Sequence, residues 1–351
     1  MKKIFSVFIL TCVFLTAQSR LSIPSEIMIA EGRQPQVAVD NMGTIRIVFG
    51  QGDKIFCTTS ANNGTTFSPP VLVAEVPSMH LGMWRGPQLA SSATCCVITA
   101  MDKSGDIHWF RLDHGSATWK SMGIVNDVKG TAPEGLMGLA ADKSDNFYAV
   151  WLDIRTGKHN QIYFADLAGK AGHWSNNRLL YQSPDEHVCE CCKPGIAVQG
   201  TEVAVMFRNW LKGSRDLYTM KSFNSGKSFS PAEKLGLDTW KLDGCPMDGG
   251  GIAIDPTAVV KSSWQRKGVV YYCQAGLPEV YIGQGRSCSI FTDGNESVIT
   301  YQTSDTLKLV TLKDKKTRVV GTGSFLKAVA LAHNKRFCVW EQDNKIKCKE
   351  M

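Results

Sequence analysis

The sequence lacks long hydrophobic runs outside its N-terminus, and it lacks clusters of basic residues. No run of about 18 or more apolar residues follows the extreme N-terminus, so no helix in the body of the chain is expected to span a bilayer. The 39 basic and 32 acidic residues are dispersed and give a mild formal charge of +7. We therefore expect no nucleic-acid partner, because nucleic-acid binding needs a concentrated basic surface.

The composition instead indicates a large folded domain. The chain has 351 residues, of which 43% are hydrophobic and only 20% are charged. Such a chain can bury a large core, which excludes a disordered or collagen-like protein. No linker-like stretch divides it, so we predict a single domain, and we expect a monomer.

The N-terminus resembles a targeting segment. Lys2 and Lys3 precede an apolar stretch from 4 to 15, and small or polar residues follow up to Ser19. This order is typical of a secretory signal, and the apolar part is short for a membrane span. We predict a signal peptide over 1–19, a propeller domain over 20–351, and export to the periplasm, the cell surface or the medium. The alternatives are a buried first helix and lipid attachment at Cys12.

One pattern of alternating apolar residues recurs through the chain. An example is the run from Pro35 to Gly43, which leads to Ile45–Phe49; another is Gly138–Asp142, which leads to Phe147–Trp151. Further copies start near Pro87, Gly195, Gly250, Ser287 and Lys327.

Alternation with period two predicts strands, and the distance of 37 to 57 residues between copies fits four short strands with their loops. We predict an all-β fold, a seven-bladed β-propeller of four-stranded antiparallel blades, with six blades as the alternative. The last copy supplies only three strands, so we expect Ser25–Ala30 to complete that blade.

In such blades, the turn after the second strand and the connection to the next blade leave from the same end. Charged and aromatic side chains that could bind or react with a ligand lie mostly in these segments. They are Arg33, Arg85, Glu190 and Arg286 before first strands, and Asp153, Arg155, Arg208, Trp210 and Arg266 after second strands. We predict a functional site on this face, around the central depression.

Four cysteines fall in two of these connections. Cys189, Cys191 and Cys192 precede the fourth blade, and Cys245 precedes the fifth. In an oxidising compartment we expect disulfides, either two cross-links or one with a free thiol pair. The alternative is a thiolate site for Zn or Cu(I), with His187 as an additional ligand. The remaining cysteines of the domain lie in strand-like runs and are expected to be buried, although Cys338 and Cys348 flank a hairpin and could pair.

Two turns share a pattern of Ser, Asn, Gly and Phe: Ser60–Phe67 and Ser222–Phe229. With the repeats and the leader, they resemble the sialidase-like superfamily of Asp-box, or BNR, repeats. The segment Val188–Cys192 is similar to a Cys-x-Cys-Cys motif of exported bacterial members.

The resemblance implies a set of site residues. Superfamily sialidases hold the substrate carboxylate with three arginines, attack with a tyrosine activated by a glutamate, and protonate the leaving group with an aspartate. Matching the motifs implies Arg33 and Arg208 as two arginines, Arg286 or Arg266 as the third, and Glu190 as the activator. Tyr281 and Tyr301 stand near the expected nucleophile position without a motif, and Asp53 and Asp153 are the candidate acids by position.

We therefore predict an exported sialidase-like propeller that recognises an anionic or polyhydroxylated glycan. Hydrolysis of that glycan is left open. The predicted binding residues are Arg33, Arg208, Arg215, Arg286 and Trp210. The alternative is a non-catalytic propeller whose cysteine-rich loops bind a metal or a partner.

Overall fold

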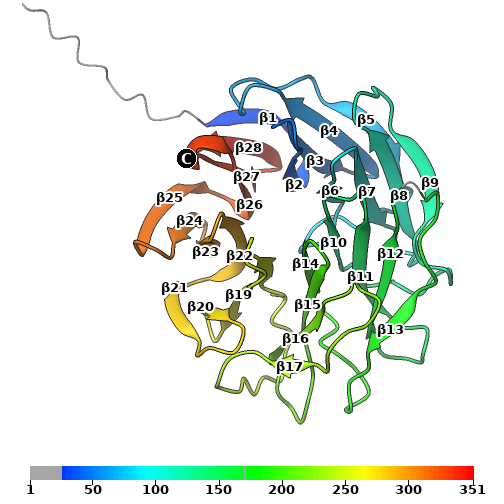
Figure 1. Cartoon of the computed structure of the whole chain (residues 1–351), viewed down its shortest axis with the longest axis vertical. Helices are drawn as coiled ribbons and strands as arrows, with labels where there is room; N and C mark the ends of the chain where they lie inside the picture. Colours follow the sequence, from blue (N-terminus) through cyan, green and yellow to red (C-terminus); the bar gives the residue numbers. More distant parts are fainter. Residues whose placement is uncertain (1–25, 170) are drawn as a thin grey trace, which may run out of the picture.

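The computed structural model describes residues 26–169 and 171–351, so the predicted signal peptide lies outside the described residues. Twenty-eight strands form seven four-stranded sheets, arranged as blades around a ring (Figure 1). The predicted seven-bladed propeller is confirmed, and the six-bladed alternative is wrong. Within the described ranges the only helical element is a 3-10 turn, η1 (Ala332–Asn334), and no helix has the length and apolar character to cross a membrane.

Blades are numbered here from one to seven, each with its strands from the centre outward. Blade one comprises β2 (Arg33–Val39), β3 (Ile45–Gln51), β4 (Lys54–Ser60) and β5 (Val71–Glu75). Blade two comprises β6 (Gln88–Ser91), β7 (Cys95–Met101), β8 (Ile107–Asp113) and β9 (Lys120–Ile124). Blade three comprises β10 (Met137–Ala141), β11 (Phe147–Asp153), β12 (Gln161–Leu167) and β13 (Arg178–Tyr181).

Blade four comprises β14 (Gly195–Gln199), β15 (Glu202–Arg208), β16 (Leu217–Ser222) and β17 (Glu233–Lys234). Blade five comprises β18 (Gly251–Ile254), β19 (Val260–Arg266), β20 (Val269–Gln274) and β21 (Val280–Gln284). Blade six comprises β22 (Arg286–Asp293), β23 (Glu296–Thr303), β24 (Thr306–Thr311) and β25 (Lys316–Thr322). Blade seven comprises β26 (Ser324–Ala330), β27 (Arg336–Gln342), β28 (Lys345–Glu350) and β1 (Ile27–Glu31).

The ring closes between the two ends of the described chain. Strand β1 pairs antiparallel with β28, with Ile27 opposite Cys348 and Glu31 opposite Lys345. The expectation that this N-terminal segment completes the last blade is confirmed for its described residues. This pairing covers the outer edge of β28 and gives blade seven its fourth strand.

The hydrophobic core lies between neighbouring blades. Every residue of β7, β11 and β19 is buried, because a second strand has a partner on each side and another blade on each face. Between blades two and three, for example, Val97 and Trp109 share one apolar cluster with Phe147 and Trp151. This packing explains why the alternating runs in the sequence are so apolar.

An aspartate organises several of the tight turns. Asp255 accepts hydrogen bonds from the N–H groups of Thr257 and Val259, at 2.9 and 3.0 Å, and pairs with Lys261 at 2.8 Å. Asp40 and Asp142 make the same contacts to the residues two, four and six positions later. The side chain thereby satisfies turn donors that would otherwise lack partners.

The two Asp-box-like turns have the same hydrogen bonds. In the second turn the hydroxyl of Ser222 accepts from Gly226 N at 2.9 Å, and Asn224 Oδ1 accepts from Ser228 N at 3.0 Å. The first turn repeats both bonds at the same lengths. Gly226 has φ of +76°, and a Cβ there would lie 2.8 Å from Phe164 of the preceding blade, so only glycine fits.

The alternating strand directions place the turn after each second strand and the connections between blades on one side of the ring, called the pocket face below. The Asp-box-like turns, which join third and fourth strands, lie on the other side. Arg33 begins β2 and Glu190 lies in the connection between β13 and β14, so both are on the pocket face, as the sequence predicts.

Candidate functional site

A pocket of about 200 Å³ opens at the centre of the pocket face. All seven innermost strands contribute to its wall, mostly with the residues where each strand begins. Its polar lining comes from Gln36, Gln88, Lys193, Asp248, Ser289 and Lys327, and its apolar lining includes Trp84, Leu89, Ile196 and Ile252. Several lining positions are glycines, among them Gly138 and Gly251, where a Cβ would lie 2.9 Å from Pro194 O and 2.7 Å from Ile290 N. These glycines let the backbones of neighbouring blades approach closely around the pocket.

Two lysines approach the pocket from different blades. Lys193 Nζ donates a hydrogen bond to Gln88 Oε1, and Lys327 Nζ lies 4.9 Å from the centre of the Trp84 ring. Burial, together with the charge of Lys327, holds the pKa of Lys193 well below its usual range. Burial also lowers the pKa of Lys327 to about 8. The charged forms of both lysines are therefore poorly solvated and have too few anionic partners. An anion bound in the pocket would stabilise these charged forms.

Asp248 is the acidic residue among the polar lining side chains. Its oxygens accept hydrogen bonds from Ser287 N at 2.7 Å and Gly250 N at 3.1 Å, so they join the connection before β18 to the start of β22. Burial raises the pKa of Asp248, partly opposed by the charge of Arg208. Its carboxylate therefore serves the backbone of the pocket wall and offsets only part of the positive charge.

Trp84 is presented by a strained loop tip in the connection between β5 and β6. Met83 and Trp84 both have positive φ, of +50° and +69°. The residues on either side of them, Gly82 and Arg85, form an isolated antiparallel β-bridge. The indole meets Phe325 edge-on, with ring centres 5.0 Å apart. Positive φ at both central residues is the pattern of a type I′ turn, in which Asn and Gly are more usual than Met and Trp.

The structure places the predicted arginines in two different roles. The guanidinium of Arg208 is buried and donates to the carbonyl oxygens of Arg215, Asp248 and Gln265 at 2.7 to 3.1 Å. Its donors are thus directed at the chain itself. Arg286 is exposed, and Arg33 is partly exposed and bonded to Glu341 at 3.2 Å.

The predicted carboxylates and tyrosines are not brought together as a catalytic set. Asp153 is fully buried and accepts from Thr131, Trp151 and Arg155. Asp53 anchors the next connection by accepting from Ser78 N and Met79 N.

Glu190 lies between blades three and four, where it accepts from Asn160 and lies 3.6 Å from His159. Among the described residues, no tyrosine hydrogen-bonds to it. Tyr281 is on the outer strand of blade five, and Tyr301 is buried in β23 of blade six. A glutamate paired with a tyrosine, which a sialidase requires, is therefore not present in the described contacts.

A stack of rings lies beside Glu190. Trp210 is sandwiched between His187, with ring centres 5.7 Å apart, and the Arg215 guanidinium at 4.5 Å. His187 in turn packs on His159 at 5.1 Å. Trp210 and Arg215, both predicted as binding residues, thus contact each other and fix the loops on this side of the face.

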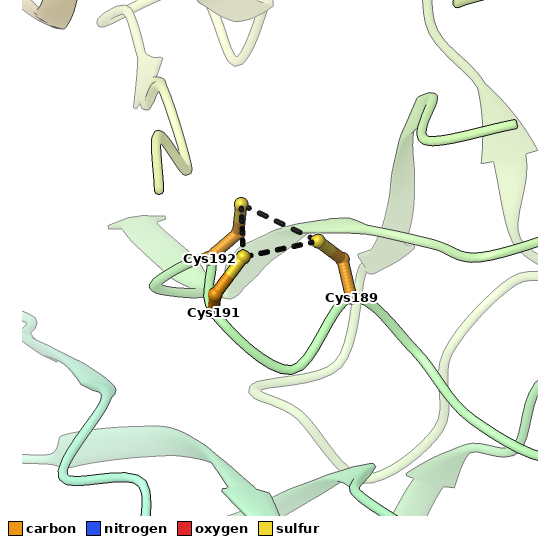
Figure 2. A group of neighbouring side chains, drawn as sticks. All are labelled: Cys189, Cys191 and Cys192. Carbon is orange, nitrogen blue, oxygen red and sulfur yellow. Dashed lines mark hydrogen bonds between the residues drawn. The ribbon is translucent and has the colours of Figure 1, made fainter. Parts of the chain in front are cut away.

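The predicted cysteine cluster forms, and the sulfur atoms of Cys189, Cys191 and Cys192 point toward one another (Figure 2). Cys191 is bonded to Cys245, while Cys189 and Cys192 are free, which is one of the two expected disulfide arrangements. A tetrahedral thiolate site needs four ligands, and only two of these four sulfurs remain thiols, so the residues do not fit Zn in this state. Cys338 and Cys348 are both buried free thiols.

The two free thiols differ in acidity. The hydrogen bond shared with Cys192, followed by the charges of Arg215 and Arg208, lowers the pKa of Cys189 to about 6 against its burial. Burial raises the pKa of Cys192 well above its usual range. In the thiolate form of Cys189 only Cys192 can donate the shared hydrogen bond, so Cys189 is the nucleophile of the pair.

Sequence reasoning missed the residues that form the pocket: Trp84, Gln88, Lys193 and Lys327. One signal was available, since Lys193 and Pro194 directly follow the distinctive cysteine motif and precede an innermost strand. Lys327 also marks the start of a repeat copy. Nothing in the sequence showed that these lysines share one pocket.

Comparison with solved structures supports the architecture. The chain has a β-propeller fold. It is similar to the BP39L lectin from Burkholderia pseudomallei, with a TM-score of 0.68 and 7% identity over 90% of this chain and 94% of that one. It is also similar to a PL25 ulvan lyase, with a TM-score of 0.59 and 10% identity over 92% and 95% of the two chains. A third is the polysaccharide lyase Uly1, with a TM-score of 0.57 and 9% identity over 92% and 90%.

At these identities the likeness concerns the fold alone. No protein-family model matches the chain, and no curated protein matches it in sequence. The Asp-box resemblance therefore stays a prediction about ancestry.

Proposed function

We propose that this protein is an exported glycan-binding propeller that holds an anionic sugar unit in its central pocket. The observation that carries the proposal is the pair of poorly solvated ammonium groups, Lys193 and Lys327, beside the Trp84 indole. A carboxylate or sulfate group would accept hydrogen bonds from the lysines, while the sugar ring would pack on the indole.

The proposal assigns recognition rather than hydrolysis. Hydrolysis of a sialoside needs a free acid and a nucleophile near the substrate. Asp153 uses both carboxylate oxygens in internal hydrogen bonds, and Glu190 contacts Asn160 and His159. Arg208 is likewise occupied by backbone carbonyls, so the substrate arginines of the resemblance are not carried into the proposal.

The structural neighbours add general support. Two of the neighbours are polysaccharide lyases, one of them bound to -[GlcA(1-4)Rha3S]-, and another is a lectin bound to a methyl fucoside. Propellers of this shape thus use their surfaces for acidic and neutral sugars alike. The lysine-lined pocket favours the acidic class here, and the leader-like residues 1–19 support export.

Binding should be measured by calorimetry with sialyllactose, oligogalacturonate and a sulfated disaccharide, with uncharged oligosaccharides of equal length as controls. We expect binding to at least one acidic probe, weakening with salt, and at least about tenfold weaker binding in Lys327→Ala. Lys129→Ala removes an exposed lysine of the same face and should bind normally. Equal binding by all three proteins, or preference for the uncharged probes, would refute the proposal.

Hydrolysis is tested separately with a chromogenic sialoside. We expect no release above background. Sustained release by the wild type that disappears in Glu190→Gln would show that the protein is a sialidase and that the catalytic set forms on substrate binding.

A further inference from the structure

The cysteine cluster contains a disulfide in contact with a free thiol pair. The connection between β13 and β14 holds Cys189, Cys191 and Cys192, and the connection between β17 and β18 holds Cys245. The sulfur of Cys189 lies 3.7 Å from that of Cys191 and 3.5 Å from that of Cys192 (Figure 2). Cys191 and Cys192 sulfurs are 3.9 Å apart. A bond from Cys189 to either Cys191 or Cys192 is thus within a short side-chain movement, while Cys191 and Cys192 are sequence neighbours, which seldom bond each other.

Accessibility changes along the cluster. Cys245 is exposed and Cys191 is half-buried, whereas Cys189 and Cys192 are 0% and 1% exposed. An external thiol can therefore reach the disulfide at Cys245, but it cannot reach the thiol pair directly. Any exchange with the inner pair must pass through Cys191.

Arg215 fixes the geometry of the cluster and carries a positive charge to it. Its Nη1 donates to Cys189 Sγ at 3.1 Å, and its Nε donates to Leu242 O, in the connection that carries Cys245, at 3.3 Å. The guanidinium is held from its other face by Trp210. A fixed cation beside a thiol stabilises the thiolate, which is the form that attacks a disulfide.

We propose that these four cysteines form a thiol–disulfide exchange site whose substrate is an external dithiol or its disulfide. In the internal step the Cys189 thiolate attacks Cys191 Sγ, the bond to Cys245 breaks, and the electron pair leaves on Cys245. The Cys192 thiolate then attacks Cys189, which releases Cys191 as a thiolate. One disulfide moves from Cys191–Cys245 to Cys189–Cys192, two protons pass from the inner pair to the outer pair, and no net electrons are gained or lost.

The external step takes place at the exposed end. One sulfur of a dithiol attacks Cys245, Cys191 leaves as a thiolate, and the second sulfur of the dithiol displaces Cys245. The dithiol is oxidised to its disulfide, and the Cys191–Cys245 pair takes up its two electrons and two protons. This inference does not depend on the glycan proposal, although Lys193 of the pocket wall directly follows Cys192.

The full-length protein should be equilibrated anaerobically in glutathione buffers of graded thiol-to-disulfide ratio, quenched in acid, and mapped by differential alkylation and peptide mass spectrometry. We expect states with no bridge, one bridge and two bridges. In the one-bridge state both Cys191–Cys245 and Cys189–Cys192 should be found. If Cys189 and Cys192 stay thiols at every ratio, the proposal is overturned.

Two cysteine variants divide the steps. Cys245→Ser should carry its bridge between Cys189 and Cys192, and Cys189→Ser should retain only Cys191–Cys245. Cys273→Ser, which removes a buried free thiol of blade five, is the matched control and should behave as the wild type. If a variant fails to fold, the wild-type titration still decides the matter.

Arg215→Met tests the role of the cation. In the variant, transfer of the bridge from Cys191–Cys245 to Cys189–Cys192, sampled at pH 7 by acid quenching and differential alkylation, should be about tenfold slower, and the pH–rate profile of this transfer should move to higher pH. A purely structural role would lower thermal stability and leave the profile in place, which would remove Arg215 from the proposal. Stoichiometric zinc or copper on four reduced thiols in the anaerobically purified protein would overturn the exchange site as a whole.

Discussion

Replacement of Lys327 by methionine tests whether the central pocket holds a charge at the expense of stability. Methionine keeps the length and apolar stem of the side chain and removes the ammonium group. Burial lowers the pKa of Lys327 from 10.5 to about 8. A lysine with a lowered pKa destabilises the folded protein wherever the unfolded chain binds the proton more tightly.

The size of the effect follows from that shift. A change of about 2.5 in pKa corresponds to about 3.4 kcal/mol if the charge is fully shielded from water. The side chain is only half-buried, and the variant also loses the contact with Trp84, which is worth about 0.5–1 kcal/mol. We therefore expect Lys327→Met to raise the free energy of unfolding by about 2 kcal/mol at pH 7.

The destabilisation by Lys327 depends on pH. The destabilisation is complete below the folded pKa of about 8. It disappears as the pH rises toward 10.5, because the lysine then becomes neutral in the unfolded chain as well. At pH 10 the difference between the two proteins should be about a quarter of its value at pH 7.

Guanidinium denaturation followed by tryptophan fluorescence, at pH 7 and pH 10, measures both numbers. The matched control is Lys308→Met, since Lys308 is also half-buried and lies 5.6 Å from the Tyr301 ring, but outside the pocket. This control should not gain stability. A variant no more stable than the wild type at pH 7, or a gain that persists at pH 10, would refute the reasoning. The same variant should lose binding of acidic glycans, so that recognition and stability oppose each other at one residue.

Three further predictions concern the scaffold. Asp255→Asn should lower the free energy of unfolding by about 1.5 kcal/mol at pH 7. Against its burial, the side-chain hydrogen bonds from Lys261 and Thr257, with the turn's backbone N–H groups, hold the pKa of Asp255 at about 2. Because the contribution of a carboxylate with a lowered pKa is lost as pH falls, urea titrations should show about half that difference at pH 3, and an undiminished difference would contradict the assignment. Gly226→Ala should destabilise by about 2–3 kcal/mol, against about 1 kcal/mol for Gly200→Ala, whose Cβ meets nothing within 4 Å; equal losses would mean that φ alone matters. Arg208→Lys should lower stability by about 3 kcal/mol or more in thermal denaturation, because it leaves buried carbonyl groups without donors, and a loss below about 1 kcal/mol would count against a structural role.

Much of the fold was readable because a propeller repeats one local pattern. The alternating runs and their spacing predict strands and blades, and the missing strand of the last copy predicts where the ring closes. The aspartate turns were not predicted, although Asp40, Asp142 and Asp255 are each followed six positions later by a polar partner. These features depend on contacts close in sequence, which composition and spacing encode.

The site was harder to predict because it depends on contacts between distant blades. Arg208 follows a strand like any exposed loop arginine, and only the fold shows that backbone carbonyls near Asp248 and Gln265 surround it. Lys193 and Lys327 are 134 positions apart and resemble surface lysines in the sequence. The proximity of Cys191 and Cys245 was predictable, because it requires only that neighbouring blades place their connections side by side.

The pairing of β1 with β28 has a consequence for the order of events during synthesis. The blade that joins the circle combines segments from opposite ends of the described chain, so it cannot assemble until the final strand has left the ribosome. Blades one to six can already be present by then. They would form an open ring in which one face of blade one and one face of blade six are not yet covered. Closure of the ring therefore depends on β28, and a truncation within β28 would leave the strands of the other six blades present while removing the partner of β1.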